Sequence, residues 1–477
     1  MPDMYRVEKD FLGEKEISNS EYYGIQSLRA KENFPITGQQ IDPHLIKAFA
    51  IVKKAAAKAN MAVGQLDKEI GEAIINAADE IIAGQYHDQF IVDPIQGGAG
   101  TSSNMNANEV IANRALEILG HQKGNYSIIS PNTHVNMAQS TNDVFPTANR
   151  IAILTMIRQL KEEMSLLHES FLKKAEEFYP LLKMARTHLQ DAVPIRLGQE
   201  FEAYGSVLAR DIERLEDASK YLLDVNLGGT AVGTGLNANP DYIKKVVEYL
   251  SEYSNIPFKT AANLIDATQH TDAYTGLSST LKICMINLSK IANDLRFMAS
   301  GPKVGLGEIT LPGKQAGSSI MPGKVNPVMA EVLNQVAFQV MGNDQTVSLA
   351  SEAGQFELNV MEPVLVYNVK ESIKIMTNVF KVFRVDCLEG IEANIEQLEH
   401  NIHTSLGIIT AINPHIGYEK ATEIAREAFE TGRPIREICL SKGVLTSDEL
   451  DQILDPNEMT KPGISAEELL NKKPVLN

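Results

Sequence analysis

The sequence contains few cysteines and no recognisable metal-binding cluster, which argues against two classes of protein. Its three cysteines, Cys284, Cys387 and Cys439, lie far apart and form no CxxC pair, so a disulfide framework is not expected. We expect them to be reduced packing residues, because a free cysteine commonly behaves as a small apolar side chain. Neither an HExxH motif nor a cluster of Cys and His is present. The sequence therefore predicts no metal site.

Positive charge and long apolar runs are also scarce. Lys and Arg number 44 against 61 Asp and Glu, which gives a formal net charge of −17. Such a field repels polyanions, so neither nucleic acid nor an acidic membrane surface is an expected partner. The first ten residues lack the apolar core of a signal peptide, and no run of about 18 apolar residues occurs. We therefore expect a cytoplasmic protein whose substrate, if anionic, is held by local donors.

Helical periodicity dominates what is present. A chain of 477 residues exceeds the size at which one hydrophobic core usually stops growing, so two or three domains are expected. Three uninterrupted helical patterns are the longest, and two further patterns follow them: about 147–178, 194–224, 268–299, 327–350 and 356–385. Apolar residues recur at alternating spacings of four and three from Leu277 to Met298. These repeats predict nearly parallel helices packed as a five-helix bundle.

The predicted fold is therefore all-α, with three domains. Residues 1–140 would form an N-terminal helical domain, 141–394 the central bundle, and 395–477 a small C-terminal helical domain with short, proline-punctuated helices. Within the 268–299 pattern, several apolar residues lie off the repeating seam: Ile283, Met285, Ile286 and Phe297. A helix that is apolar on more than one face needs neighbours all round, which indicates association between subunits.

Three segments rich in Gly, Ser, Thr and Asn come immediately before a helical pattern: 97–104 (GGAGTSSN), 136–143 (NMAQSTND) and 313–327 (GKQAGSSIMPGKVNP). The N-terminus of a helix offers free backbone N–H groups and a partial positive charge, which together can bind a carboxylate. Any one segment could be a simple capped loop, because Ser, Thr and Asn are good N-caps. Three such segments, each with more hydroxyls than a cap needs, favour a carboxylate-binding site.

The third segment carries the most chemistry. Its glycines permit an open backbone and its prolines restrict the ends, which describes a loop that can move between defined positions. Ser318 and Ser319 lie where amides and hydroxyls can surround an oxyanion, and Lys324 is the cation in the core of the loop. Asn326 is predicted as the N-cap of the next helix, with Pro327 as its first residue.

A fourth segment, 185–194 (ARTHLQDAVP), places Thr187 and His188 ahead of a long helix. A lone histidine is more often structural, but its polar neighbours favour a functional role here, in which a carboxylate would orient the ring. Glu331, one turn into the helix after the serine loop, is the candidate partner.

The sequence does not match the motifs of two other common classes of enzyme. Lys324 is followed by Val325, unlike a P-loop lysine, and the GxSxG motif of serine hydrolases is absent. The short stretch 233–238 (GTGLNA) is interpreted as a turn near the site.

The string GSSIMPGKVNP resembles the signature of the aspartase and fumarase superfamily. The order GGAGTS, QSTND, THLQDAVP, GTGLN, signature loop and FELNVMEP is similar to that superfamily along most of the chain. Thr141 stands where fumarases usually carry a second Ser, and PVMAEV (327–332) stands where they have PTQCEA, so the sequence resembles the aspartases more. Ala330, where aspartases commonly have Pro, is one departure.

This resemblance implies a cofactor-free homotetramer that interconverts L-aspartate with fumarate and ammonia at sites built from three subunits each. It makes Ser318 the general base. It assigns the β-carboxylate to Thr101, Ser140, Thr141 and Ser319, and the α-carboxylate to Thr187, the backbone of Met321, Lys324 and Asn326. Asn142 and His188 would lie near the amino group. The alternatives are a fumarase, which expels water, a lyase for larger succinyl adducts, and a structural relative without activity.

Overall fold

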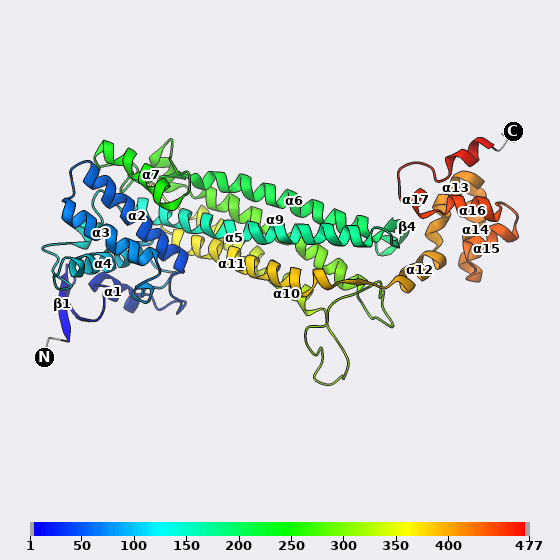
Figure 1. The fold of residues 1–477 in the computed structure, drawn as a ribbon, viewed down its shortest axis with the longest axis horizontal. Coiled ribbons are helices and arrows are strands. Elements are labelled where there is room, and N and C mark those ends of the chain that lie inside the picture. Colours follow the sequence, from blue (N-terminus) through cyan, green and yellow to red (C-terminus); the bar gives the residue numbers. More distant parts are fainter. Residues whose placement is uncertain (1–3, 473–477) are drawn as a thin grey trace. The chain divides into compact units, whose positions relative to one another are not determined.

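Helices dominate the computed structural model, which describes residues 4–472 (Figure 1). In this part of the chain the strands form only two-stranded pairs. The predicted all-α class is therefore confirmed. No helix among the described residues has the length and apolar character needed to cross a membrane.

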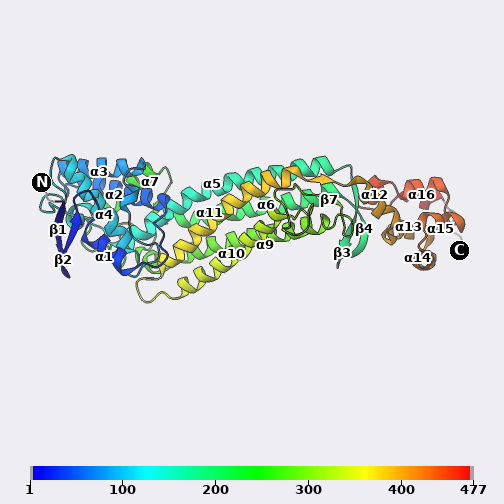
Figure 2. The ribbon, with the colours of Figure 1, turned by 90° about the horizontal axis from the view of Figure 1, so that it is seen from below.

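The five predicted helical patterns correspond to five long helices: α5 (Thr141–Phe178), α6 (Leu197–Lys220), α9 (Asp272–Met298), α10 (Val328–Glu352) and α11 (Glu362–Asp386). The chain divides into two compact units, and the boundaries between the units fall inside these helices. Each long helix thus contributes one segment to each unit. Within each unit the segments run side by side (Figures 1 and 2). The three-domain division at residues 140 and 394 stays a prediction.

Burial along α9 agrees with the repeat in its sequence. The seam residues from Leu277 to Met298 are at most 4% exposed, whereas Ile283, Ile286 and Phe297 are 38%, 45% and 55% exposed. The three cysteines are buried and unpaired, as expected for packing residues. The seam residues are therefore buried by other parts of the same chain. The apolar residues beside the seam remain exposed to solvent.

The first unit comprises the residues up to Glu163, Asp211–Ile286 and Val336–Asn378. Besides its segments of the long helices, its main elements are β1 (Tyr5–Asp10), β2 (Gly13–Ser18), α1 (Ile25–Asn33), α2 (Pro43–Ala62), α3 (Lys68–Ile82), α4 (Thr101–Ile118), α7 (Pro240–Ser254) and α8 (Leu264–Gln269). The side chains of Asp42 and Asp67 cap α2 and α3 by accepting from the first free amides of each helix.

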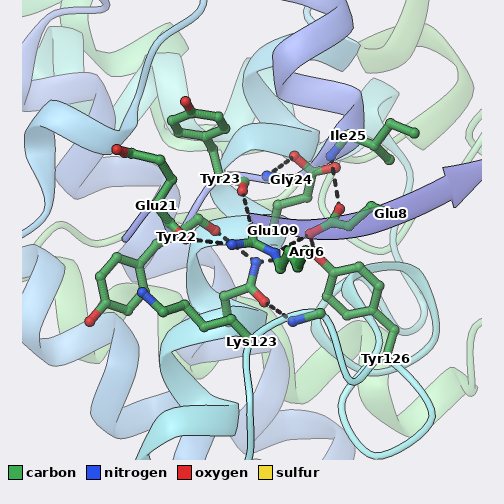
Figure 3. Close-up of polar contacts among 12 residues, drawn as sticks. Arg6, Glu8, Glu21, Tyr22, Tyr23, Gly24, Ile25, Glu109, Lys123 and Tyr126 are labelled. Atoms are coloured by element: carbon green, nitrogen blue, oxygen red, sulfur yellow. Dashed lines mark hydrogen bonds and ion pairs between the residues drawn. The ribbon is translucent and has the colours of Figure 1, made fainter. Parts of the chain in front are cut away.

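Two carboxylates from other elements cap α1 in place of a local side chain (Figure 3). Glu109 of α4 accepts from the amide of Gly24 at 2.8 Å, and Glu8 of β1 accepts from the amide of Ile25 at 2.9 Å. Arg6 donates to Glu8 at 2.8 Å. Burial raises the pKa of Glu109 to about 7. These contacts hold β1, α1 and α4 together through buried polar groups.

The second unit comprises Met164–Arg210, Asn287–Gln335 and the residues from Val379 onward. It contains the hairpin of β3 (Leu182–Thr187) and β4 (Gln190–Arg196), and its short helices are α12 (Ile395–Thr404), α13 (Ile409–Ile416), α14 (Tyr418–Thr431), α15 (Ile435–Ser441), α16 (Ser447–Ile453) and α17 (Pro456–Met459). The short helices pack around their own buried cluster, which includes Ile412, Ile424, Ile438, Leu450 and Ile453.

Candidate active site

Thr101 begins α4. The three residues before it have a left-handed backbone conformation that few residue types adopt easily. Gly98, Ala99 and Gly100 all have positive φ, at 88°, 55° and 90°. A Cβ on Gly100 would lie 2.2 Å from the ring of Phe145, so this position requires glycine. The Thr101 hydroxyl is exposed and donates to the carbonyl of Gly98 at 2.7 Å. The glycine-rich turn thus presents Thr101 at the positive end of α4.

Ser140 directly precedes α5, and Thr141 and Asn142 are the first two residues of that helix. The amide of Asn142 donates to the hydroxyl of Ser140 at 3.3 Å, and its side chain donates to the carbonyl of Ala231 at 2.7 Å. Thr141 is 9% exposed, and its hydroxyl oxygen accepts from the side-chain amide of Asn104 at 3.2 Å. All three residues therefore stand at the N-terminus of a long helix, as the sequence predicts.

Asp143 is fully buried and holds Ser140 and the segment around Gly228 in place through hydrogen bonds. Its carboxylate accepts from the amides of Ser140 at 2.9 Å and of Gly228 and Thr230 at 3.0 Å each. Burial raises the pKa of Asp143 to about 6. The segment 233–238 that follows is a turn, as interpreted from its sequence. Its neighbour Ala231 meets Asn142, so this turn does lie beside the predicted group.

Thr187 and His188 lie at the tip of the β3–β4 hairpin in the second unit, and both are exposed. His188 and Leu189 both have positive φ, at 55° and 59°, as a two-residue hairpin turn of type I′ requires. The hairpin is anchored by Arg186, whose guanidinium donates to both carboxylate oxygens of buried Glu308 at 2.7 and 3.0 Å. A bidentate pair of this kind fixes the orientation of the strand.

The serine loop closes on itself in the second unit. The amide of Gly317 donates to the carbonyl of Lys324, and the side chain of Asn326 donates to the carbonyl of Gly317, both at 2.8 Å. A Cβ on Gly317 would lie 2.5 Å from the Lys324 oxygen, so the closed loop needs glycine there. The predicted N-cap at Asn326 is wrong by one residue, because α10 begins at Val328 and the Asn326 side chain closes the loop instead.

Ser318 is the half-buried centre of this loop. Its hydroxyl oxygen accepts from the amides of Ile320 at 3.2 Å and Met321 at 3.0 Å. Two N–H donors aimed at one oxygen favour negative charge on it. Ser319, Met321 and Lys324 are exposed. The loop therefore combines a supported hydroxyl with a cation that solvent or a ligand can reach.

Glu331 lies one turn into α10 and is half-buried. In the part of the single chain that the structure describes, no hydrogen bond or ion pair joins it to His188, so their pairing stays a prediction. The twelve predicted site residues are thus divided: Thr101 and 140–142 belong to the first unit, and 187–188 and those between 318 and 331 to the second.

A buried polar cluster beneath the first group escaped sequence reasoning. It consists of Lys53, Asn104, Asn136, Gln139 and Asp143, which lie on or beside α2, α4 and α5. The available signal was weak, because Lys53 stands in the stretch VKKAAAKA, where any of three lysines could face solvent.

Comparison with known proteins supplies a family over almost the whole chain. A family model described as Lyase matches residues 13–342, and a second one, described as Fumarase C C-terminus, matches residues 408–461. The chain is 65% identical to an aspartate ammonia-lyase of Bacillus sp, which covers 96% of this chain and 98% of the relative. It is 64% identical to the aspartate ammonia-lyase of Bacillus subtilis strain 168, with 98% of each chain covered.

The fold has solved counterparts as well. The crystal structure of a fumarate lyase:delta crystallin from Brucella melitensis is similar to this chain with a TM-score of 0.94 and 48% identity, covering 96% of this chain and 100% of that one.

Proposed function

Because the chain belongs to the aspartate ammonia-lyases of the aspartase and fumarase superfamily, we propose how its own residues carry out the elimination. The enzyme interconverts L-aspartate with fumarate and ammonia, so the predicted preference for an aspartase over a fumarase is confirmed. The proposal is that hydroxyl-rich turns stabilise a doubly ionised carboxylate while a loop serine removes a proton from Cβ.

The main catalytic difficulty is the charge that develops on the β-carboxylate. A Cβ proton is very weakly acidic, so its removal requires the neighbouring carboxylate to accept a second negative charge. We assign this carboxylate to Thr101, Ser140, Thr141 and Ser319. The positive ends of α4 and α5 support the assignment, because both helices begin at these threonines. Each preorganised donor of this kind is worth about 2.7–4 kcal/mol in the transition state, although such contributions are not additive.

Ser318 is the proposed base. Ser318 acts as its alkoxide, whose oxygen takes the Cβ proton and becomes a hydroxyl. The electrons of the C–H bond move into the aci-carboxylate, and collapse of that intermediate forms the Cα–Cβ double bond and breaks the C–N bond, so that the substrate ammonium leaves as ammonia with the electron pair. The two amides that donate to the Ser318 oxygen support this role. Movement of the loop would deliver the base and exclude water.

The α-carboxylate is assigned to Lys324, Asn326, Thr187 and the backbone of Met321. The Met321 amide donates to Ser318 in the present state. If the substrate carboxylate takes over this amide, the amide of Ile320 remains as the donor that favours negative charge on the Ser318 oxygen.

The amino group is assigned to Asn142 and His188, with Glu331 orienting the histidine. The side-chain NH₂ of Asn142 donates to the backbone carbonyl of Ala231. The side-chain oxygen of Asn142 can then accept a hydrogen bond from a substrate ammonium. An acceptor oxygen is what a protonated amine requires.

We further propose that the enzyme is a cytoplasmic homotetramer in which each active site contains residues of three subunits. The proposal includes no cofactor and no metal. Exposed apolar residues support assembly. They include Ile283, Ile286 and Phe297 of α9 and Phe338 and Leu349 of α10. Three chains meeting at each site would bring together residues that one chain distributes over two units.

Mixing two inactive variants tests the shared site. Thr141→Val and Ser318→Ala are each purified, unfolded together in equal amounts and refolded. If the two residues reach a site from different chains, about one quarter of the sites in random tetramers would contain neither substitution. Activity with L-aspartate, followed by the absorbance of fumarate, should then recover to roughly that fraction. Each variant refolded alone is the control, and a mixture no more active than the controls would contradict subunit sharing.

A further inference from the structure

Lys53 of α2 is a fully buried cation whose partners all come from distant parts of the chain. Its side-chain nitrogen donates to the side-chain oxygens of Asn104 at 2.7 Å, Gln139 at 2.9 Å and Asn136 at 3.0 Å. Burial lowers the pKa of Lys53 to about 7, and the charge of Asp143 opposes this effect. Three carbonyl oxygens match the three protons of an ammonium, which further favours the charged form.

An ammonium group can only donate hydrogen bonds, so it decides how the amides around it are turned. Asn104 must present its oxygen to Lys53, and its NH₂ group must therefore point away from the lysine. One proton of that NH₂ group meets Asn136 at 3.2 Å, and the other meets the hydroxyl oxygen of Thr141, also at 3.2 Å. Because Thr141 accepts from Asn104, the hydroxyl proton of Thr141 must point elsewhere.

We propose that Lys53 is a positioning residue for the lyase reaction, acting through Asn104 to keep the Thr141 hydroxyl as a hydrogen-bond donor to the substrate β-carboxylate. This inference rests on the proposed function, which places Thr141 against that carboxylate. A threonine hydroxyl can otherwise turn its lone pairs toward an anion. A Thr141 hydroxyl that already points its proton at the carboxylate matters most when the carboxylate gains its second negative charge. Loss of Lys53 should therefore lower kcat more than it changes KM.

The same lysine also holds the chain that leads into Thr141. Asn136 and Gln139 lie between the one-turn helix η2 (Pro131–Val135) and α5, and Gln139 donates onward to the carbonyls of Val135 and Met137 at 3.0 and 3.1 Å. Lys53 therefore connects the N-terminal turn of α4 with the approach to α5.

Lys53→Met is the first test, with Lys54→Met as its matched control. Methionine keeps the length of the side chain but leaves three side-chain oxygens without their donor, so the melting temperature is measured beside kcat. Lys54 is the adjacent residue of the same helix but pairs with Asp79 at 2.6 Å, outside the cluster. We expect Lys53→Met to lower kcat about 10- to 100-fold with a much smaller change in KM, and Lys54→Met to leave both near those of the native enzyme. A native kcat in Lys53→Met would overturn the inference.

Asn104→Asp tests the orientation itself and does not depend on the folding of the methionine variant. Aspartate has nearly the same shape and still accepts from Lys53, but it lacks the N–H group that Thr141 accepts. The Thr141 hydroxyl would then donate to the aspartate and turn away from the substrate. We expect kcat to fall at least as far as in Lys53→Met, while the melting temperature stays near the native value. Full activity in Asn104→Asp would overturn the inference.

Combination with Thr141→Val separates this inference from the proposed function. If Lys53 acts through Thr141, the double variant should have the kcat of Thr141→Val alone, because the hydroxyl it orients is gone. A purely structural lysine would cause a further loss in the double variant, and that result would overturn the inference. If Thr141→Val itself keeps native activity, the proposed β-carboxylate site is wrong. If Thr141→Val is impaired while Lys53→Met and Asn104→Asp are not, only the inference is wrong.

Discussion

The two groups of candidate residues are supported in opposite ways. Thr101 and Thr141 stand on the first turns of helices, beside a polar cluster in which buried Lys53 donates to three side-chain oxygens. Ser318 and Lys324 stand on a loop of largely exposed residues that two hydrogen bonds close. The difference separates two tasks. Groups that stabilise charge gain most from a rigid, buried setting, whereas a base that must meet and release substrate needs an element of low local stability.

Removal of the loop hydroxyl should have the largest effect. Ser318→Ala is expected to lower kcat by about a thousandfold or more, because it deletes the proposed base and nothing replaces it. Binding of succinate, an unreactive dicarboxylate, should persist in calorimetry. Ser206→Ala, on an exposed turn of α6, is the control. If Ser318→Ala turns over L-aspartate at a rate near that of the control, the serine is not the base.

The loop cation should act on binding. Lys324→Met is expected to raise KM for L-aspartate about 10- to 100-fold, since a charge-assisted hydrogen bond is worth about 1.5–3 kcal/mol. The overall charge of −17 makes a local cation more important for an anionic substrate. Steady-state kinetics decide the matter. An unchanged KM would remove Lys324 from the substrate site.

Two glycine substitutions compare the settings directly. Gly100→Ala forces a Cβ toward the buried ring of Phe145 at a φ of 90°, so both the melting temperature and kcat should fall, the former by several degrees. Gly317→Ala disturbs only the closure of the serine loop. It should lower kcat about tenfold and leave the melting temperature within a degree of the native value. Equal effects of the two substitutions on melting temperature would contradict the contrast between rigid turn and mobile loop.

Buried charge in the first unit should also make stability depend on pH. Burial raises the pKa of Glu362 to about 8 from its ordinary value of 4.5. The folded chain therefore holds this proton more tightly, and the stability that the group contributes below about pH 4.5 is lost as pH rises to 8. Glu362→Gln removes this pH-dependent contribution to stability. The melting temperature of the variant should therefore rise relative to that of the native chain between pH 5 and 8. Exposed Glu357→Gln is the control, and parallel curves for all three proteins would contradict the expectation.

Local pattern was enough to predict much of the architecture. The seam from Leu277 to Met298 repeats along one helix, so its burial follows from helical geometry alone. The three hydroxyl-rich segments precede α4, α5 and α10 because glycine, proline and capping residues end and begin helices through nearby backbone groups. Membership of the superfamily is readable in the same segments.

Tertiary structure decided which polar residues cooperate. Lys53 and Lys54 are adjacent and identical in type, yet one is fully buried beneath two helix N-termini and the other pairs with Asp79. The partners of Lys53 lie 51, 83 and 86 residues away along the chain. Asn326, a suitable local cap by its sequence, instead closes a loop onto Gly317. Helical periodicity reports the face on which a residue lies, whereas the identity of its partner depends on which distant segments pack against that face.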